Sequence, residues 1–247
     1  MILQKSDKEI CAGPEAADNM NIRGRAAAAV QPVKRWARVT LELKQIALGF
    51  GPNRLFSGLG LAIKPGQICL LTAPSGAGKS SLLRWVAGLD SPGLQAEGEV
   101  ILNGRAITRL AAEHRHIGLL FQNPLVFPHL NVADNLGFGL AKSVTGAARQ
   151  HAIEAGLARA GLAGLGPRDP NTLSGGQQAR LALLRCLLAK PEALLLDEPF
   201  SSLDGKRREE MVSLVRAEAV RLGLPVLLVS HDPRDEGVAD SPPVRLG

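Results

Sequence analysis

The chain has 247 residues, of which 45% are hydrophobic, and this is enough for one large domain with a substantial core. Its formal charge of +6 comes from basic residues interspersed with acidic ones, which favours a solvated surface over nucleic-acid binding and leaves an anionic membrane surface open as a partner. No apolar stretch reaches the roughly 18 residues of a membrane span, so the chain is not expected to cross a membrane by itself.

The three cysteines, Cys11, Cys69 and Cys186, are widely spaced and belong to no paired motif. Cys69 lies in an apolar strand-like stretch and Cys186 in an apolar helical stretch. We therefore expect buried, reduced thiols of the kind found in cytosolic proteins, and not a disulfide framework.

Residues 1–36 differ in composition from the rest of the chain. They mix charges, glycine, proline and a run of alanines without apolar periodicity, and their acidic residues fit neither a signal peptide nor a transit peptide. We predict a disordered tail over residues 1–36 and a folded domain over residues 37–247.

Apolar, strand-like stretches recur along the folded part. The pattern alternates from Val39, continues through a stretch that ends in a glycine-rich loop, and includes residues 97–104, which close on an Asn-Gly turn. Short apolar strands are predicted at residues 117–121, 193–199 and 226–232, with helical spacing between them. Strands that alternate with helices predict an α/β fold with a mostly parallel sheet, whose ligands bind at the carboxyl ends of the strands.

A near match to the phosphate-binding loop G-x-x-x-x-G-K-[ST] occurs in LTAPSGAGKSSLLRW, with Ala73 in place of the first glycine. Such a loop surrounds a phosphate chain with backbone N–H groups at a helix N-terminus. Gly76 and Gly78 permit the tight turn, Lys79 places a positive charge against the β- and γ-phosphates, and the Ser80 hydroxyl can bind Mg²⁺. Alanine adds one methyl group ahead of the turn, so we expect the loop to bind. Taken alone, the match also fits an ordinary strand–turn–helix junction.

Two further strands end in polar residues suited to catalysis. Asp197 follows three leucines and is positioned as a second anchor for Mg²⁺, while Glu198 is free to polarise a water molecule in line with the γ-phosphate. His231 ends the next strand, where it could donate a hydrogen bond to the γ-phosphate. An Asp-Glu pair can also cap a helix, and a lone histidine can be structural.

The stretch TLSGGQQARLALLRCLLAKP, residues 172–191, holds a second glycine-rich turn before an amphipathic helix. With the phosphate loop, LLLDEPFSSLD and His231 in this order, the chain resembles the ATP-binding cassette family over about residues 38–235, and LSGGQ is that family's signature. The family's loop pattern admits alanine at the position of Ala73, so the resemblance implies ATP binding. It also implies a P-loop NTPase core with a mostly parallel sheet, an antiparallel β subdomain and a helical subdomain inserted at about residues 123–172.

The resemblance also implies roles for individual residues. The implied catalytic residues are Glu198, His231 and Gln122. Of these, Gln122 resembles the family glutamine that contacts Mg²⁺ and the attacking water. The metal ligands are Ser80, Gln122 and Asp197. ATP is bound by Phe50, Ala73, Pro74, Ser75, Gly76, Ala77, Gly78, Lys79, Ser80 and Ser81. The signature residues, which contact the ATP of the opposite subunit in a head-to-tail dimer, are Leu173, Ser174, Gly175, Gly176 and Gln177. The residues that pair across the dimer are Ser201, Ser202, Leu203 and Asp204. For Phe50, stacking on adenine competes with core packing.

The stretch FQNPLVFPHLNVADNL resembles the standalone ATPase subunits of binding-protein-dependent importers of small solutes, including thiamine-type and uncharacterised ones. This resemblance implies transmembrane permease subunits, an extracytoplasmic solute-binding protein, a homodimer of the ATPase and a peripheral location on the cytoplasmic face of the membrane, with no nucleic acid. The alternatives are an exporter ATPase and a soluble single-cassette ATPase of the cluster-assembly type. After His231 we expect a shortened last helix–strand pair and no regulatory domain of the kind many importers carry. The solute is not identified, because such a subunit does not touch the cargo.

Overall fold

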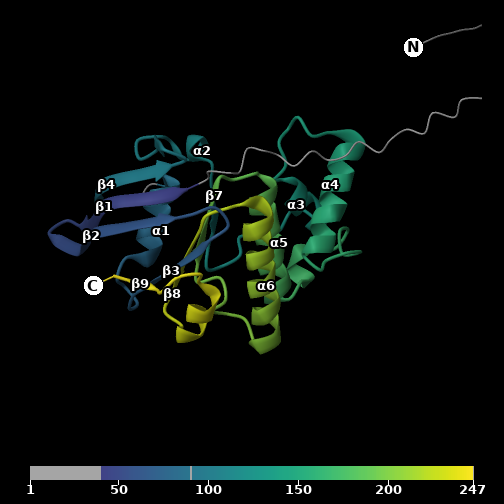
Figure 1. Ribbon diagram of the computed structural model, residues 1–247. Coiled ribbons are helices and arrows are strands. Elements are labelled where there is room, and N and C mark those ends of the chain that lie inside the picture. The colour runs from purple at the N-terminus through teal and green to yellow at the C-terminus, as the bar shows by residue number, and fades with distance from the viewer. Residues whose placement is uncertain (1–39, 90, 247) are drawn as a thin grey trace, which may run out of the picture. The chain divides into compact units, whose positions relative to one another are not determined.

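Two β-sheets form the framework of the structure, a computed structural model that describes residues 40–89 and 91–246 (Figure 1). The first sheet is antiparallel and has the strand order β2-β1-β4-β5. Asn103 and Gly104 join its last two strands with φ angles of 56° and 75°, as a tight Asn-Gly hairpin turn requires. The strand bounds are β1 Leu41–Phe50, β2 Asn53–Ile63, β4 Leu94–Leu102 and β5 Arg105–Ala106.

The second sheet has the order β6-β7-β8-β3-β9, and every neighbouring pair in it is parallel. Its central strands β7 and β8 are buried at every residue, which is usual for parallel strands covered on both faces. This confirms the predicted α/β fold with a parallel and an antiparallel sheet. The strand bounds are β3 Ile68–Thr72, β6 Ile117–Leu120, β7 Ala193–Asp197, β8 Val226–Ser230 and β9 Val244–Arg245.

Three of the helices begin at residues whose side chains cap them. The side chains of Asn131, Ser174 and Asp204 accept hydrogen bonds from backbone N–H groups in the first turns of α3, α5 and α6. Among the described residues, no helix combines the length and the apolar character needed to cross a membrane. The helix bounds are α1 Lys79–Ala87, α2 Ala112–Arg115, α3 Val132–Gly137, α4 Gly146–Arg159, α5 Gly175–Leu188 and α6 Gly205–Leu222, with 3₁₀ turns η2 Pro170–Thr172 and η3 Pro233–Val238.

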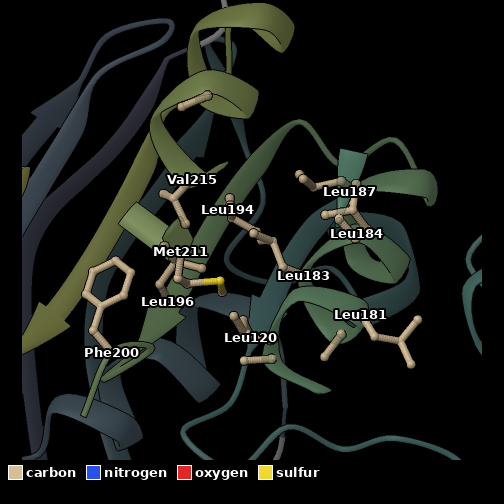
Figure 2. Close-up of a cluster of buried hydrophobic side chains, with 14 of the residues drawn as sticks. Leu120, Leu181, Leu183, Leu184, Leu187, Leu194, Leu196, Phe200, Met211 and Val215 are labelled. Atoms are coloured by element: carbon tan, nitrogen blue, oxygen red, sulfur yellow. The ribbon is translucent and has the colours of Figure 1, made fainter. Parts of the chain in front are cut away.

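The parallel sheet separates two hydrophobic clusters. Leu194 and Leu196 of β7 lie on the face covered by α5 and α6, and Figure 2 shows them near Leu183 and Met211 of those helices. Leu195, on the opposite face, belongs to the cluster that contains residues of α1 and of the antiparallel sheet. The alternation follows from the two-residue period of a strand, so one apolar run serves both layers.

The helical stretch after Gln122 packs beside α5. Helices α3 and α4 contact each other and both contact α5, on the far side of α5 from the antiparallel sheet (Figure 1). They lie within residues 123–172, where the helical subdomain is predicted. The predicted tail over residues 1–36 and Cys11 lie outside the described residues, whereas Cys69 is a buried free thiol and Cys186 a partly buried one.

The structure gives the exact strands and helices in two stretches that the sequence described only roughly. The strand-like stretch ahead of the phosphate loop is two strands, because residues 64–67 form a turn in which Gln67 N–H donates to Lys64 C=O at 3.1 Å. Gly66 at the turn has a φ of 73°, and β2 and β3 belong to different sheets. After His231, the short last helix–strand pair is η3 followed by β9, which pairs with β3.

Leu196→Ala should lower the free energy of unfolding by about 2–5 kcal/mol, because it leaves a cavity between β7 and the covering helices. Leu196 is 0% exposed. Val220→Ala is the control, since Val220 on α6 is 73% exposed and its truncation should change stability by less than about 0.5 kcal/mol. Urea unfolding followed by circular dichroism measures both, and equal effects would contradict the assigned core.

Candidate functional site

The phosphate loop joins β3 to α1 with alanine at its first position. Ala73 is buried, and its carbonyl accepts a hydrogen bond from Lys79 Nζ at 2.9 Å. Gly78 caps α1 with a φ of 91°, and a Cβ there would lie 2.7 Å from Leu55 Cδ1. The positive φ therefore favours glycine at position 78, where a Cβ would also displace the end of Leu55, whereas the methyl group of Ala73 is accommodated.

Lys79 stands at the first turn of α1 and is only 6% exposed. Its Nζ also donates to the Pro74 carbonyl at 3.1 Å and lies 3.7 Å from Glu198 Oε1. A buried ammonium group needs such partners, because its desolvation is otherwise unfavourable. These contacts hold the lysine charge over the loop.

Asp197 ends β7 and is 7% exposed. Burial raises the pKa of its carboxyl group, and a hydrogen bond from the Ser80 hydroxyl opposes that shift. Its Oδ1 has no hydrogen-bond partner among the described residues. A buried carboxylate oxygen without a donor suits a hard cation that prefers oxygen ligands.

The donor set fits Mg²⁺ bound together with phosphate oxygens. Ser80 and Asp197 are in contact, and the Gln122 side chain lies near the same strand ends. Among the described residues, no group of three or more His, Cys, Asp and Glu side chains could hold a metal ion alone. Mg²⁺ at nucleotide sites commonly keeps few protein ligands and takes the rest from phosphates and water.

Glu198 follows Asp197 and connects three of the predicted site residues. Its Oε1 lies 2.8 Å from Nδ1 of His231, and its Oε2 accepts a hydrogen bond from Gln122 Nε2 at 3.3 Å. Lys79 is the third neighbour of the carboxylate. The predicted catalytic residues Glu198, His231 and Gln122 therefore meet at one place.

The Glu198 backbone is held in an uncommon conformation, with a φ of 45°. Its N–H donates to Val229 C=O at 3.0 Å, and its own carbonyl accepts from Ser201 N–H at 3.2 Å and Ser201 Oγ at 2.9 Å. These bonds tie the residue to β8 and to the following turn, and they set the direction of its side chain.

A cleft of about 500 Å³ runs along this cluster. Phe50, the last residue of β1, is 37% exposed and lines the cleft, so it is not a core residue. Leu55 of β2 also lines it and was not expected from the sequence, because an apolar strand residue carries no motif. The lining residues are Phe50, Leu55, Ser75, Gly76, Gly78, Lys79, Ser80, Ser81, Gln122, Glu198 and His231.

The predicted signature residues, 173–177, do not line this cleft. Ser174 caps α5 in a capping box: Ser174 N–H donates to Gln177 Oε1 at 2.9 Å, and Gln177 N–H donates to Ser174 Oγ at 3.4 Å. Gly175 is exposed, with open space where a Cβ would stand. A Cβ on Gly176 would touch Arg207, so the start of α5 lies against the start of α6.

The residues predicted to pair across a dimer, 201–204, connect β7 to α6. Asp204 caps α6 by accepting from Arg207 N–H at 3.2 Å, and Leu203 is buried. Ser201 and Ser202 are exposed. The two serines are thus available to a partner, while Leu203 and Asp204 hold the segment in place.

The model of the ABC transporter family matches residues 56–201, more than half of the chain. This chain belongs to the ABC transporter family. As a member of that family it is a nucleotide-binding ATPase, and the family resemblance drawn from the sequence is confirmed.

Individual ABC relatives extend the match. The chain is 42% identical to the uncharacterized ABC transporter ATP-binding protein YnjD of Escherichia coli over 202 residues, which cover 80% of this chain and 93% of YnjD. It is 41% identical to the Fe(3+) ions import ATP-binding protein FbpC 1 of Rhizobium meliloti and 38% identical to FbpC of Brucella abortus. These matches cover 80% and 82% of this chain but only 55% and 56% of the relatives, so the chain spans about half the length of the Fe(3+) import proteins.

Asp197→Asn should raise the free energy of unfolding of this ABC ATPase at neutral pH. Because burial raises the Asp197 pKa, the folded state binds its proton more strongly than the unfolded state, and stability falls as the pH rises through the folded-state pKa. The neutral amide removes that dependence, so the gain over the wild type should shrink as the pH is lowered through that pKa. Urea unfolding at pH 7 and pH 5 measures this, and a less stable Asp197→Asn at pH 7 would contradict it.

Proposed function

We propose that this chain is the ATP-hydrolysing subunit of an ABC importer, and that it drives solute translocation through separate permease chains. The observation that carries the proposal is the meeting of Lys79, Gln122, Glu198 and His231 at the carboxyl end of the parallel sheet, beside the phosphate loop. The import direction rests on the similarity to the Fe(3+) import ATP-binding proteins and on the stretch after Gln122. We assign no solute, since such a subunit does not contact its cargo.

Nucleotide binding would use the loop and Phe50. Ser75, Gly76, Gly78 and Lys79 line the cleft, where the loop N–H groups and the Lys79 ammonium would hold the β- and γ-phosphates of ATP at the start of α1. Phe50 lines the same cleft with 37% of its surface exposed, which supports its stacking on adenine.

Mg²⁺ would be held by Ser80, Asp197 and Gln122, and it would neutralise charge on the β- and γ-phosphate oxygens. The partnerless Oδ1 of Asp197 supports this assignment. The hydrogen bond between Ser80 and Asp197 supports a site that both side chains would share.

Hydrolysis would depend on Glu198 as the general base. Its carboxylate would accept a proton from water as the water oxygen bonds to the γ-phosphorus and the bond to the ADP oxygen breaks, which yields ADP and phosphate. His231 and Gln122 both contact this carboxylate and would orient it and the water. The His231 side chain is half exposed and would also be open to a phosphate oxygen.

The signature residues would complete the site of a second copy. They do not line the cleft of their own chain, yet Gly175 presents exposed backbone at the N-terminus of α5, where the helix dipole favours an anion. A head-to-tail homodimer would place this terminus against the γ-phosphate bound by the other chain, with residues 201–204 between the two.

A groove after β6 would receive a permease segment. It has a volume of about 280 Å³ and is lined by Leu119, Leu120, Phe121, Leu125, Phe127, Phe138, Gly139, Ala182, Arg185, Cys186 and Ala189. Leu125 is 56% and Phe138 65% exposed, which is unusual for large apolar side chains close together. The groove begins close to Gln122 in sequence, so a docked segment would be linked directly to the catalytic cluster. The chain would then work peripherally on the cytoplasmic face of the membrane, with permease subunits and an extracytoplasmic solute-binding protein.

Glu198→Gln tests the proposed chemistry. It keeps the side-chain shape but removes the base, so ATP hydrolysis should fall by about a hundred- to ten-thousand-fold while ATP binding survives. The unhydrolysed ATP should then hold two chains together, visible as an ATP-dependent dimer in size-exclusion chromatography. Normal hydrolysis by this variant would remove Glu198 from the catalytic role.

A second change in that variant tests the shared site. Gly175→Asp adds a carboxylate in open space at the first turn of α5, where an acidic residue is favourable to the helix, so folding should be preserved. Repulsion from the partner's γ-phosphate should abolish the ATP-dependent dimer. Gly237→Asp, also in open space, is the matched control and should leave the dimer intact. A dimer that survives Gly175→Asp would refute the head-to-tail arrangement.

Leu125→Asp tests the groove. Of the three apolar residues after Pro124, Val126 packs against the core and Phe127 against Phe138 and Arg185, so Leu125 can be changed with the least structural effect. We expect normal ATP binding but loss of the chain from washed membranes of its source cells. Val220→Asp, at a still more exposed apolar residue of α6, should remain membrane-associated. Full membrane association of Leu125→Asp would argue against a permease groove here.

A further inference from the structure

We propose that the Glu198 carboxylate competes with the γ-phosphate of ATP for Lys79, Gln122 and His231, and thereby sets the selectivity of the chain between ATP and ADP. This role rests on the proposed function, in which the same three side chains serve the γ-phosphate and the attacking water. It is distinct from proton transfer, because it concerns nucleotide binding before any bond is broken.

The contacts of the carboxylate resemble those that a terminal phosphate would make. Glu198 Oε1 lies 2.8 Å from His231 Nδ1 and 3.7 Å from Lys79 Nζ, and Oε2 accepts from Gln122 Nε2 at 3.3 Å. Nδ1 faces a carboxylate and is therefore the protonated nitrogen of the ring. The carboxylate thus hydrogen-bonds to side chains from the segments after β6 and β8 and forms an ion pair with Lys79 of α1.

The environment of the carboxylate strengthens these contacts. The Glu198 side chain is 11% exposed, so water competes weakly for its oxygens. The backbone bonds to Val229 and Ser201 hold the residue at its positive φ, which keeps the side chain directed into the cluster. The carboxylate is consequently already bound to Lys79, Gln122 and His231 before any nucleotide arrives.

ATP and ADP differ in how they disturb this arrangement. The γ-phosphate of ATP brings a second anion to the same donors, so Glu198 must release some of them before ATP is fully bound. ADP lacks that group and can use the loop N–H groups while the bonds of Glu198 to His231 and Gln122 persist. The carboxylate therefore weakens ATP binding specifically, and after hydrolysis it can retake its donors, which favours release of phosphate.

The experiment compares the wild-type residue with Glu198→Gln and Glu198→Asp, all carrying Gly175→Asp so that dimers do not form. The glutamine keeps the reach and loses the charge, whereas the aspartate keeps the charge and withdraws it by about 1.5 Å, one carbon–carbon bond. Isothermal titration calorimetry gives Kd for Mg²⁺ with ADP and for Mg²⁺ with the non-hydrolysable analogue AMP-PNP.

Both variants should bind AMP-PNP about tenfold more tightly than the wild-type residue, and ADP within about twofold. Tenfold corresponds to about 1.4 kcal/mol, the order of one charge-assisted hydrogen bond. If only the glutamine variant binds AMP-PNP more tightly and the aspartate variant has the wild-type Kd, the effect is simple charge repulsion. That result would overturn the proposal. Equal changes for both nucleotides, or no change, would also overturn it.

A second measurement tests the same competition on the unmutated chain, so that no substitution can disturb folding. The ¹⁵N resonance of His231 Nδ1 should shift on addition of AMP-PNP with Mg²⁺ and stay in place on addition of ADP with Mg²⁺. A shift with both nucleotides, or with neither although both bind, would contradict the competition. Failure to bind either nucleotide is a different result, because it would refute the proposed ATPase site itself.

Discussion

The parallel register of β7 between β6 and β8 is the constraint on which the site depends. Leu196 pairs with Leu120 and Asp197 with Val229, so Glu198, Gln122 and His231 leave the sheet at nearly the same level. The strand β3, which carries the phosphate loop, pairs with β8 in the same direction. A slip of one residue would also move Leu194 and Leu196 to the opposite face, so the packing of the core enforces the alignment of these three side chains.

The same alignment places several energetically unfavourable features at one edge of the sheet. Lys79 and Asp197 are nearly buried, one oxygen of Asp197 is without a donor, and Glu198 is held in a conformation that residues with a side chain seldom adopt. Each feature would be unfavourable in a protein selected for stability alone. The fully buried apolar residues of β7 and β8 supply the compensating stability, and a bound phosphate chain with its cation would relieve the charges.

The sequence predicted the fold class, the family and the strand ends that carry polar residues, because these depend on local patterns. Three leucines before Asp197 and the glycines around Lys79 indicate a buried strand and a tight loop without knowledge of distant contacts. It did not predict the turn that divides β2 from β3 or the place of Leu55 in the cleft, because both depend on which sheet each strand joins. Nor could it show that Ser174 and Gln177 bond to each other, since the signature pattern alone does not distinguish capping from binding a ligand. The individual roles of the site residues remain predictions.

The loop after Gln122 is held against α3 and α5 by a small set of polar contacts. Asn135 of α3 is 0% exposed; its side chain accepts from Phe127 N–H at 2.8 Å and donates to the Phe127 carbonyl at 2.9 Å. Arg185 of α5 binds Asn135 and the Leu125 carbonyl, and its guanidinium lies 4.4 Å from the centre of the Phe127 ring. The loop after Gln122 is therefore tied to α5, the helix whose N-terminus carries the signature residues. Under the proposed function, a segment docked in the groove would therefore contact a loop that continues from Gln122 at one end and is bonded to α5 at the other.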